Sequence, residues 1–270
     1  MRDIDFSRKF SLDRLRLSRM VSCIFRKPSA SDLEVGSEMG VNPYMVTGFR
    51  GWLRKTGLGG GISGAYALSP FGKLVATYDP ELNHSGTLWL LHYHLVSEHA
   101  ERAEVWYRAF NEFLTPGVRF DRTALQVYVE RTLEATPKNK TGIAKDCNEF
   151  IKGYKAPIGL GKLELVREGE NDMCEVGLVR LPEPYIFAYV LFDAWQRRFD
   201  HTDTLRVTQV CQEPELPGKV FAARRDQVVQ SLQTLQSMGL VNIVDSQHEP
   251  VTRRFRDDPH QLIATFYASL

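Results

Sequence analysis

Between positions 31 and 57 the apolar residues recur three or four apart, which predicts two short helices joined by a tight turn. Ser31 caps the first helix, and Gly40 lies in the turn. Asn42 and Pro43 begin the second helix, since Asn is favoured at the N-cap and Pro at the first helical position. Gly57 ends it, where a left-handed residue is favoured. The inner stripe of the second helix is apolar and comprises Met45, Val46, Phe49, Trp52 and Leu53.

The opposite face of this second helix is small, polar and basic, and comprises Tyr44, Thr47, Gly48, Gly51, Arg54 and Lys55. The run Gly59–Gly61 and the strand-like Ala65–Leu68 have the form of a wing, and Ser69-Pro70 begins another helix. Residues 1–30 supply the first helix. This order of helices and strands predicts a winged helix-turn-helix domain over residues 1–78. Such a helix fits the DNA major groove, but winged helices also serve as dimerisation and protein-docking modules.

Residues 79–181 are predicted to form a helical middle domain with a short β-hairpin. The segment Thr87–Leu95 is apolar nearly all round, which indicates a central buried helix. Lys138–Lys140 reads as a basic surface loop. Further helices are expected over Glu101–Leu114, from Phe120 through Leu133 and over Thr141–Tyr154, and strands over Lys162–Arg167 and Cys174–Leu181.

Residues 182–270 resemble a second winged module, with helices over Pro184–Phe199 and Arg224–Met238 followed by strands over Leu240–Val244 and Val251–Phe255. Arg224, Arg225 and nearby glutamines suit base edges or phosphates, although a solvated face explains them equally well. We therefore expect a mainly α protein: an N-terminal winged helix-turn-helix, a helical middle and a C-terminal winged-helix-like domain with small β-hairpins.

The distribution of charge favours nucleic acid as a partner. The whole chain has 270 residues and a formal net charge of +1. Residues 1–78 alone hold 12 Lys and Arg against 6 Asp and Glu, whereas the remainder holds 22 against 27. A basic domain attached to an otherwise acidic protein is typical of proteins that bind the phosphates of nucleic acid. Gly48 and Gly51 would let another surface approach, or would pack against a neighbouring element. The expected DNA-binding residues are Tyr44 and Thr47 near the bases, and Arg50, Arg54, Lys55 and Lys73 on phosphates.

No pattern supports a specific reaction. The sequence contains no phosphate-binding loop, no dinucleotide-binding fingerprint, no histidine pair of a metalloprotease and no nucleophile elbow. We therefore expect no catalytic residue, metal or cofactor. His92 and His94 point roughly 200° apart on a helix and cannot chelate one ion, so these two and His99 are expected in the core. Asp146, Glu149 and Lys152 share a helix face; a nuclease uses such residues, but an exposed ion-pair ladder is the ordinary explanation.

Composition also bears on the cellular setting. No stretch approaches the roughly 18 apolar residues of a membrane helix, and the acidic N-terminus is unlike a secretion signal. The four cysteines, at 23, 147, 174 and 211, lack the close pairing of a zinc site, so free thiols in a cytoplasmic protein are expected.

Several segments, in order and at suitable spacing, together resemble domain-of-unknown-function family four thousand and seven of bacteria. They are Val35–Met39 through Phe49–Leu53, Leu68–Gly72, Asp79–Leu82, Thr87–His92, Trp106-Tyr107, Phe110–Phe113, Lys145-Asp146 and Pro182–Asp193. At its start the chain departs from the family, with Phe6–Phe10 in place of the usual His-containing opening.

Members of that family lie in gene clusters with phosphoadenosine-phosphosulfate-reductase-like proteins, ATPases and other genes of DNA sulfur modification (phosphorothioation) or phage defence. The resemblance implies a non-enzymatic, DNA-binding accessory protein with duplex DNA as partner, and supplies no catalytic residues. One alternative is a scaffold that docks a sulfurtransferase-like or ATPase partner through the Trp89–Phe113 helices. Another is a nuclease that acts with a partner. Homodimerisation is also open.

Overall fold

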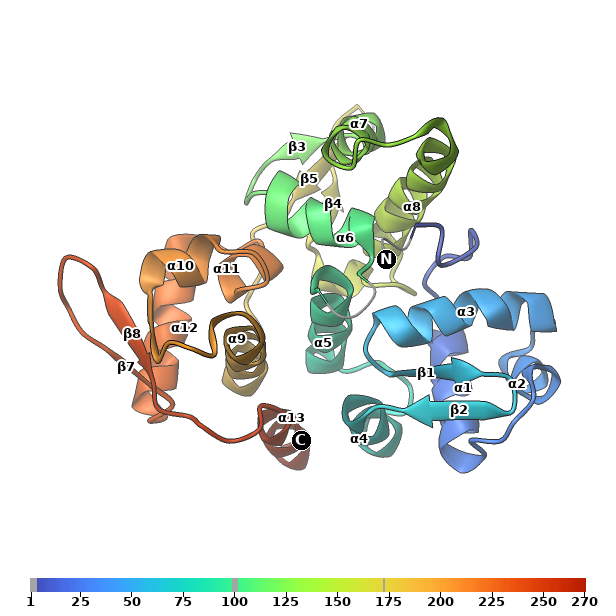
Figure 1. Cartoon of the computed structure of the whole chain (residues 1–270), viewed down its shortest axis with the longest axis horizontal. Coiled ribbons are helices and arrows are strands. Elements are labelled where there is room, and N and C mark those ends of the chain that lie inside the picture. The colour runs from blue at the N-terminus through green and yellow to red at the C-terminus, as the bar shows by residue number, and fades with distance from the viewer. Residues whose placement is uncertain (1–3, 99–101, 172) are drawn as a thin grey trace.

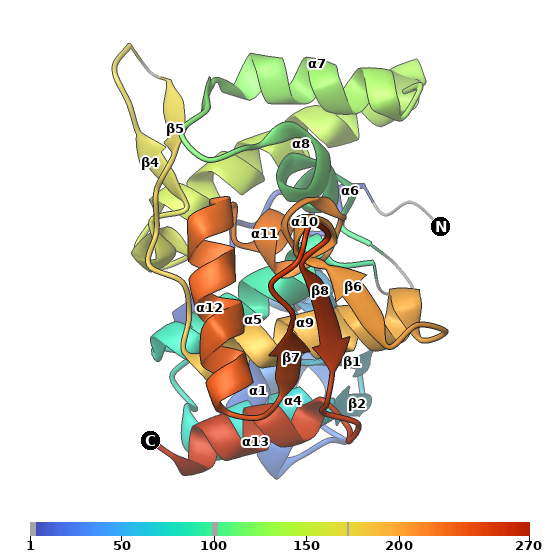
Figure 2. The same ribbon diagram turned by 90° about the vertical axis from the view of Figure 1, so that its left-hand side faces the viewer.

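The computed structural model describes residues 4–98, 102–171 and 173–270, and in these ranges the chain is mainly helical with small antiparallel sheets (Figures 1 and 2). Its N-terminal part packs three helices beside a two-stranded hairpin and a fourth helix (Figure 1). These elements are α1 (Arg14–Arg26), α2 (Asp32–Met39), α3 (Pro43–Lys55), β1 (Gly59–Ile62), β2 (Ala65–Leu68) and α4 (Pro70–Tyr78).

Local capping chemistry sets the boundaries of α2 and α3, as predicted. Ser31 and Glu34 form a capping box at the start of α2, and Gly40 ends that helix in the left-handed region at φ 69°. The Asn42 side chain accepts a 2.9 Å hydrogen bond from the amide of Met45, which satisfies one of the free donors of α3.

The middle of the chain is built around α5 (Ser85–Val96), which is buried from Gly86 to Val96, as its apolar sequence predicts. The next helix, α6 (Glu104–Arg108), continues into a π turn, η1 (Ala109–Phe113), and is therefore not the regular helix expected up to Leu114.

Two longer helices follow, α7 (Arg122–Thr132) and α8 (Pro137–Lys155). The prediction of a basic loop at 138–140 is wrong, because Pro137 occupies the first position of α8 and starts the helix four residues early.

A three-stranded antiparallel sheet in the order β3-β5-β4 covers this region. Its strands are β3 (Arg119–Phe120), β4 (Val166–Glu168) and β5 (Cys174–Val176), with the short 3₁₀ turn η2 (Gly161–Leu163) before β4. β5 falls within the predicted strand Cys174–Leu181 but ends at Val176. Of the strand predicted over Lys162–Arg167, only Val166 and Arg167 lie in β4, because η2 occupies its beginning, and β3 is a strand that was not predicted. After Val176 the chain leaves the sheet and runs past α12 to α9 (Figure 2).

The C-terminal part has four helices, a second three-stranded sheet in the order β6-β8-β7 and a final helix. The final helix was not predicted; it packs on α9 and α4, where Tyr267 stacks on Tyr78 with ring centroids 5.8 Å apart. The elements are α9 (Pro184–Phe199), β6 (Thr204–Arg206), α10 (Val207–Gln212), α11 (Pro217–Val220), α12 (Arg225–Ser237), β7 (Val241–Ile243), β8 (Pro250–Arg253) and α13 (His260–Ala268).

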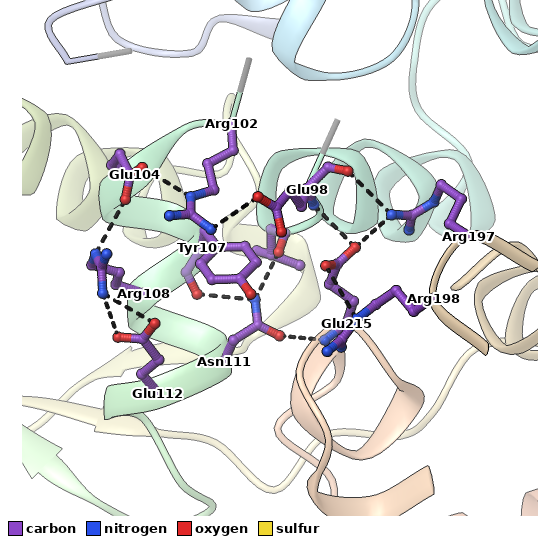
Figure 3. A network of polar contacts seen from close by, with 11 residues as sticks. Glu98, Arg102, Glu104, Tyr107, Arg108, Asn111, Glu112, Arg197, Arg198 and Glu215 are labelled. Carbon is purple, nitrogen blue, oxygen red and sulfur yellow. Dashed lines mark hydrogen bonds and ion pairs between the residues drawn. The ribbon is translucent and has the colours of Figure 1, made fainter. Parts of the chain in front are cut away.

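A buried polar network joins the middle of the chain to the C-terminal part (Figure 3). The carboxylate of Glu215, which has no exposed surface, accepts hydrogen bonds from the Glu98 amide at 3.0 Å and from Arg197 at 2.7 Å. Asn111, in the π turn, accepts from the Glu215 amide at 2.6 Å and donates to the carbonyl of Tyr107. Since these groups lie on η1, on α9 and before α11, the network fixes how those elements meet.

The same network continues along α6, where Arg102 and Arg108 share the buried carboxylate of Glu104 at 2.8 and 3.1 Å. The guanidinium of Arg102 also lies 4.4 Å from the ring centroid of Tyr107 (Figure 3). Because guanidinium groups meet these carboxylates, the cluster is a structural ion network.

Candidate nucleic-acid interface

The outer face of α3 divides into a covered stripe and an open stripe. The covered stripe includes Gly48 and Gly51, which pack against the N-terminal segment 6–10. A Cβ atom at Gly51 would lie 2.4 Å from the Phe6 carbonyl oxygen, and one at Gly48 would lie 2.8 Å from that of Ser7. The glycines therefore admit the protein's own chain, so of the two alternatives that the sequence left open, packing against a neighbouring element is the one observed.

Lys55 belongs to the same covered stripe and is only 4% exposed. Its ammonium lies 5.7 Å from the ring centroid of Phe6, which itself sits between Trp52 and Trp106 at centroid distances of 4.9 and 5.2 Å. The expectation that Lys55 contacts phosphate is therefore corrected: Phe6 and its neighbours hold this side chain inside the protein.

The open stripe of α3 carries Thr47, Arg50 and Arg54, which follow one another at helical spacing. Arg54 is exposed, and Thr47 is half-buried with its hydroxyl donating to the Pro43 carbonyl at 3.2 Å. Tyr44, at the edge between the two stripes, is 61% exposed. The N-terminal half of α3 therefore presents an aromatic ring and a hydroxyl, whereas the exposed cation, Arg54, lies in the last turn of the helix.

Arg50 is restrained by the elements beside it. Its Nη1 lies 3.4 Å from the Asp32 carboxylate, which also accepts a hydrogen bond from the Tyr66 hydroxyl of β2. Burial and the nearby Asp32 raise the pKa of Tyr66, so the phenol stays protonated and donates. The three side chains tie α3 to α2 and to the hairpin, and Arg50 would have to leave Asp32 to reach a phosphate.

Two cations that sequence reasoning did not select lie beside this surface. Arg8 and Lys9 are exposed, and both adopt positive φ, 50° and 69°. The guanidinium carbon of Arg8 lies 5.9 Å from the ring centroid of Tyr44, and Phe10 packs edge-on against the same ring. The sequence drew attention to the segment Phe6–Phe10, because the chain departs there from its family resemblance. That this segment packs on α3 depends on the tertiary structure and could not be read from the sequence.

Fewer positive charges of the N-terminal part are unpaired and accessible on the folded surface than the sequence alone suggests. Arg26 and Lys27 pair with Glu38 and Glu34 at 2.8 and 2.5 Å, and Lys27 together with Ser31 lowers the pKa of Glu34 to about 2. Arg14 is buried and donates to backbone carbonyls such as that of Gly159 at 2.6 Å.

The hairpin, whose residues 59–68 include no Lys or Arg, adds no cation. Lys73, on α4, is exposed. The exposed cations of this part include Arg8, Lys9, Arg19, Arg54 and Lys73, and the Arg8 guanidinium lies over the Tyr44 ring.

The C-terminal candidates lie elsewhere. Arg224 and Arg225 are exposed at the start of α12, on the opposite side of the molecule from α3 in Figure 1. Arg224 pairs with Asp226 at 3.6 Å, and Arg225 forms an ion pair with Glu249. The fold does not bring these two arginines together with the α3 residues.

His92 is a core residue, as expected. Its Nδ1 lies 2.6 Å from the Tyr154 hydroxyl and its Nε2 lies 2.7 Å from the Val220 carbonyl, so Nε2 carries the proton. Burial lowers the pKa of His92 to about 4. His94 is also buried and stacks on Phe71, whereas His99 falls outside the described residues.

Asp146 and Glu149 are 1% and 3% exposed, so the expected exposed ion-pair ladder is wrong. Asp146 accepts a 2.8 Å hydrogen bond from the Asp5 amide, and Glu149 accepts one from the Ser11 hydroxyl. Both carboxylates thus anchor the N-terminal segment. Across the described ranges, no cluster of three or more His, Cys, Asp and Glu side chains has the arrangement of a metal site.

The surface proposed for docking a partner protein is also corrected. Trp89 is 4% exposed and Phe110 has no exposed surface, because α5 and α6 form the centre of the molecule. These helices are therefore enclosed by the chain's own elements. Among the described residues there is no helix with the length and apolar character needed to span a bilayer.

The chain has a mainly helical fold with small antiparallel sheets, and comparison with known proteins identifies its family. The chain belongs to the family described as "Protein of unknown function (DUF4007)", whose model matches residues 22–262. It is also similar to two solved structures, "Magnesium ion-bound SspB crystal structure" at 20% identity and "SspB crystal structure" at 21%. For each, the TM-score is 0.79 and the match covers 98% of this chain and 88% of the other. No curated protein matches the chain in sequence.

Proposed function

We propose that this protein is a non-enzymatic DNA-binding accessory of a bacterial DNA-modification or antiviral defence system. Residues 1–78 act as a winged helix-turn-helix in this proposal, with α3 as the recognition helix and β1–β2 as the wing. Residues 79–181 form the helical middle, and 182–270 form a second winged-helix-like domain. The order of elements from α1 to α4 supports this division, since it is the order of a winged helix.

The carrying observation is the open surface at the N-terminal half of α3. Tyr44 projects from it at 61% exposure, with the Arg8 guanidinium over its ring. Arg54 lies almost three turns further along, in the last turn of α3. The first turns of a recognition helix are the part that meets base edges. An exposed phenol beside cations suits that task, because the ring and hydroxyl contact bases while the cations bind phosphates.

The cellular setting rests on the family. The family resemblance implies a setting of DNA sulfur modification and phage defence, and the similar fold of SspB supports a common architecture. A DNA-binding accessory in phosphorothioation is the role that joins this setting to the α3 surface.

Equilibrium binding to a fluorescent duplex tests the proposal. We expect the double substitution Arg8→Ala and Arg54→Ala to weaken binding by about tenfold or more, since each removes a phosphate contact. Arg119→Ala is the matched control, because Arg119 is an exposed arginine paired with Glu175 on a distant sheet. Duplexes with and without phosphorothioate linkages then show whether the modification is sensed. Equal affinity of the double variant and the parent protein would overturn the proposal.

A further inference from the structure

A cleft of about 670 Å³ lies between α12 and the segment that follows β5. Gln227, Gln230, Ser231 and Thr234 of α12 line one wall, and residues 179–184 line the other. This volume falls within the roughly 300–1,000 Å³ of ordinary ligand sites. The cleft is separate from the α3 surface.

The wall opposite α12 has the character of an unpaired strand. Residues 177–180, which follow β5 after the chain has left the sheet, alternate between buried and exposed positions, as β-strands do. Within the described part of the chain, the backbone amides of residues 178–181 donate no hydrogen bond. An unpaired extended backbone is a template for an added strand.

The α12 wall is polar, and one of its side chains contacts the extended segment. The Gln227 side chain bridges the two walls by donating to the Val179 carbonyl at 2.8 Å. Gln230, Ser231 and Thr234 lie further along the same face. A strand on one side and a helix on the other make a groove of the kind that takes an extended peptide.

The charges in the cleft favour an acidic ligand. Arg180 is exposed and makes no ion pair with any described residue, and Lys162 donates to the neutral amide of Asn83 at 2.7 Å. Of the two acids that line the cleft, Glu164 is already paired with Arg167 at 2.7 Å, and Glu183 accepts only a 3.5 Å hydrogen bond from Ser85. The unpaired cations therefore outnumber the unpaired anions.

The residues at the floor of the cleft favour a peptide over a nucleic acid as the ligand. Its aromatic residues, Trp89 and Phe187, are 4% and 0% exposed, so neither offers a ring face for stacking a base. The Trp89 indole N–H donates no hydrogen bond to a described residue, which leaves it available to a carbonyl of a ligand. Main-chain hydrogen bonding, and not base stacking, is what this site can provide.

We propose that this cleft binds an extended, acidic peptide segment of a partner protein, which adds as a strand to residues 178–181 and faces α12. An acidic side chain of the peptide lies opposite Arg180 and Lys162. The site is independent of the DNA-binding proposal, since α3 lies on the other side of the molecule (Figure 1).

A phage-displayed library of randomised nine-residue peptides, selected on the intact protein, tests this site. Ser231→Trp fills the cleft, and Gln233→Trp is its control, because Gln233 is exposed on the same helix but does not line the cleft. We expect selected peptides to carry acidic residues and to lose about tenfold or more in affinity with Ser231→Trp and with Arg180→Glu, but not with Gln233→Trp. Circular dichroism confirms that each variant is folded, and the surface variant Arg180→Glu tests the site even if Ser231→Trp does not fold.

Backbone pairing has its own readout. A selected peptide slows hydrogen exchange at alternate amides of residues 178–181, because an added strand pairs with every second residue, and N-methylation of the peptide backbone abolishes its binding. The proposal is overturned if selection yields no peptide that Ser231→Trp rejects, if the N-methylated peptide binds as well as its parent, or if an oligo-dT strand takes the cleft in place of peptide.

Discussion

Phe6 packs edge-on against Trp52, with ring centroids 4.9 Å apart and an interplanar angle of 78°. This contact places the N-terminal segment across one stripe of α3, where it buries Lys55 and covers Gly48 and Gly51. The same segment delivers Arg8 to the ring of Tyr44. The N-terminal segment therefore both limits and completes the surface that we propose for DNA.

Gly51→Ala is expected to disturb this packing. The new methyl group would lie 2.4 Å from the Phe6 carbonyl oxygen, so the segment must shift, at a cost of about 1–3 kcal/mol in the free energy of unfolding. Urea denaturation measures the loss. Gly60→Ala is the control, because a Cβ there meets nothing within 4 Å. Equal stability of the two variants would show that segment 6–10 does not pack on α3 as described.

Arg197→Met is expected to destabilise the protein by about 3 kcal/mol, since it leaves the fully buried carboxylate of Glu215 without its closest cation. Arg167→Met removes an exposed partner of Glu164, whose ion pair is worth at most about 1 kcal/mol. Chemical denaturation of both variants separates a buried from an exposed ion pair. Losses of the same size would contradict the burial of the Glu215 network.

His92 is expected to make stability depend on pH. Its pKa falls from about 6.5 in the unfolded chain to about 4 in the folded protein, because burial disfavours the charged ring. Between these values the unfolded state binds more protons, so the free energy of unfolding decreases as pH falls from 6.5 to 4, by up to about 3 kcal/mol. His92→Gln removes this component. Unfolding free energies at pH 7 and pH 4.5 measure it, and parallel pH profiles for the two proteins would rule it out.

The parts that the sequence predicts well are those fixed by local chemistry. Ser31, Asn42 and Pro43 act on the backbone within a few residues, so the starts of α2 and α3 follow from the sequence. The burial of α5 follows in the same way, because a helix that is apolar on all sides has no face for water.

What escaped prediction depends on contacts distant in sequence. Gly48 and Gly51 show that something lies close to α3, but only the fold shows that it is the segment 6–10. Asp146 and Glu149 have the spacing of an exposed ladder, yet the amide of Asp5 and the hydroxyl of Ser11 bury them. A period of three or four residues identifies a helix face and does not identify what covers it.

The salt dependence of duplex binding tests the central claim most directly. Affinity measured over a range of ionic strengths gives the number of phosphates neutralised, because each contributes about 0.9 to the slope of log K against log salt concentration. Simultaneous Arg8→Ala and Arg54→Ala substitutions are predicted to reduce that slope by about 2 relative to the parent protein, while Arg119→Ala leaves it unchanged. A parent affinity that is insensitive to salt, or a slope that survives the double substitution, would contradict DNA binding through α3.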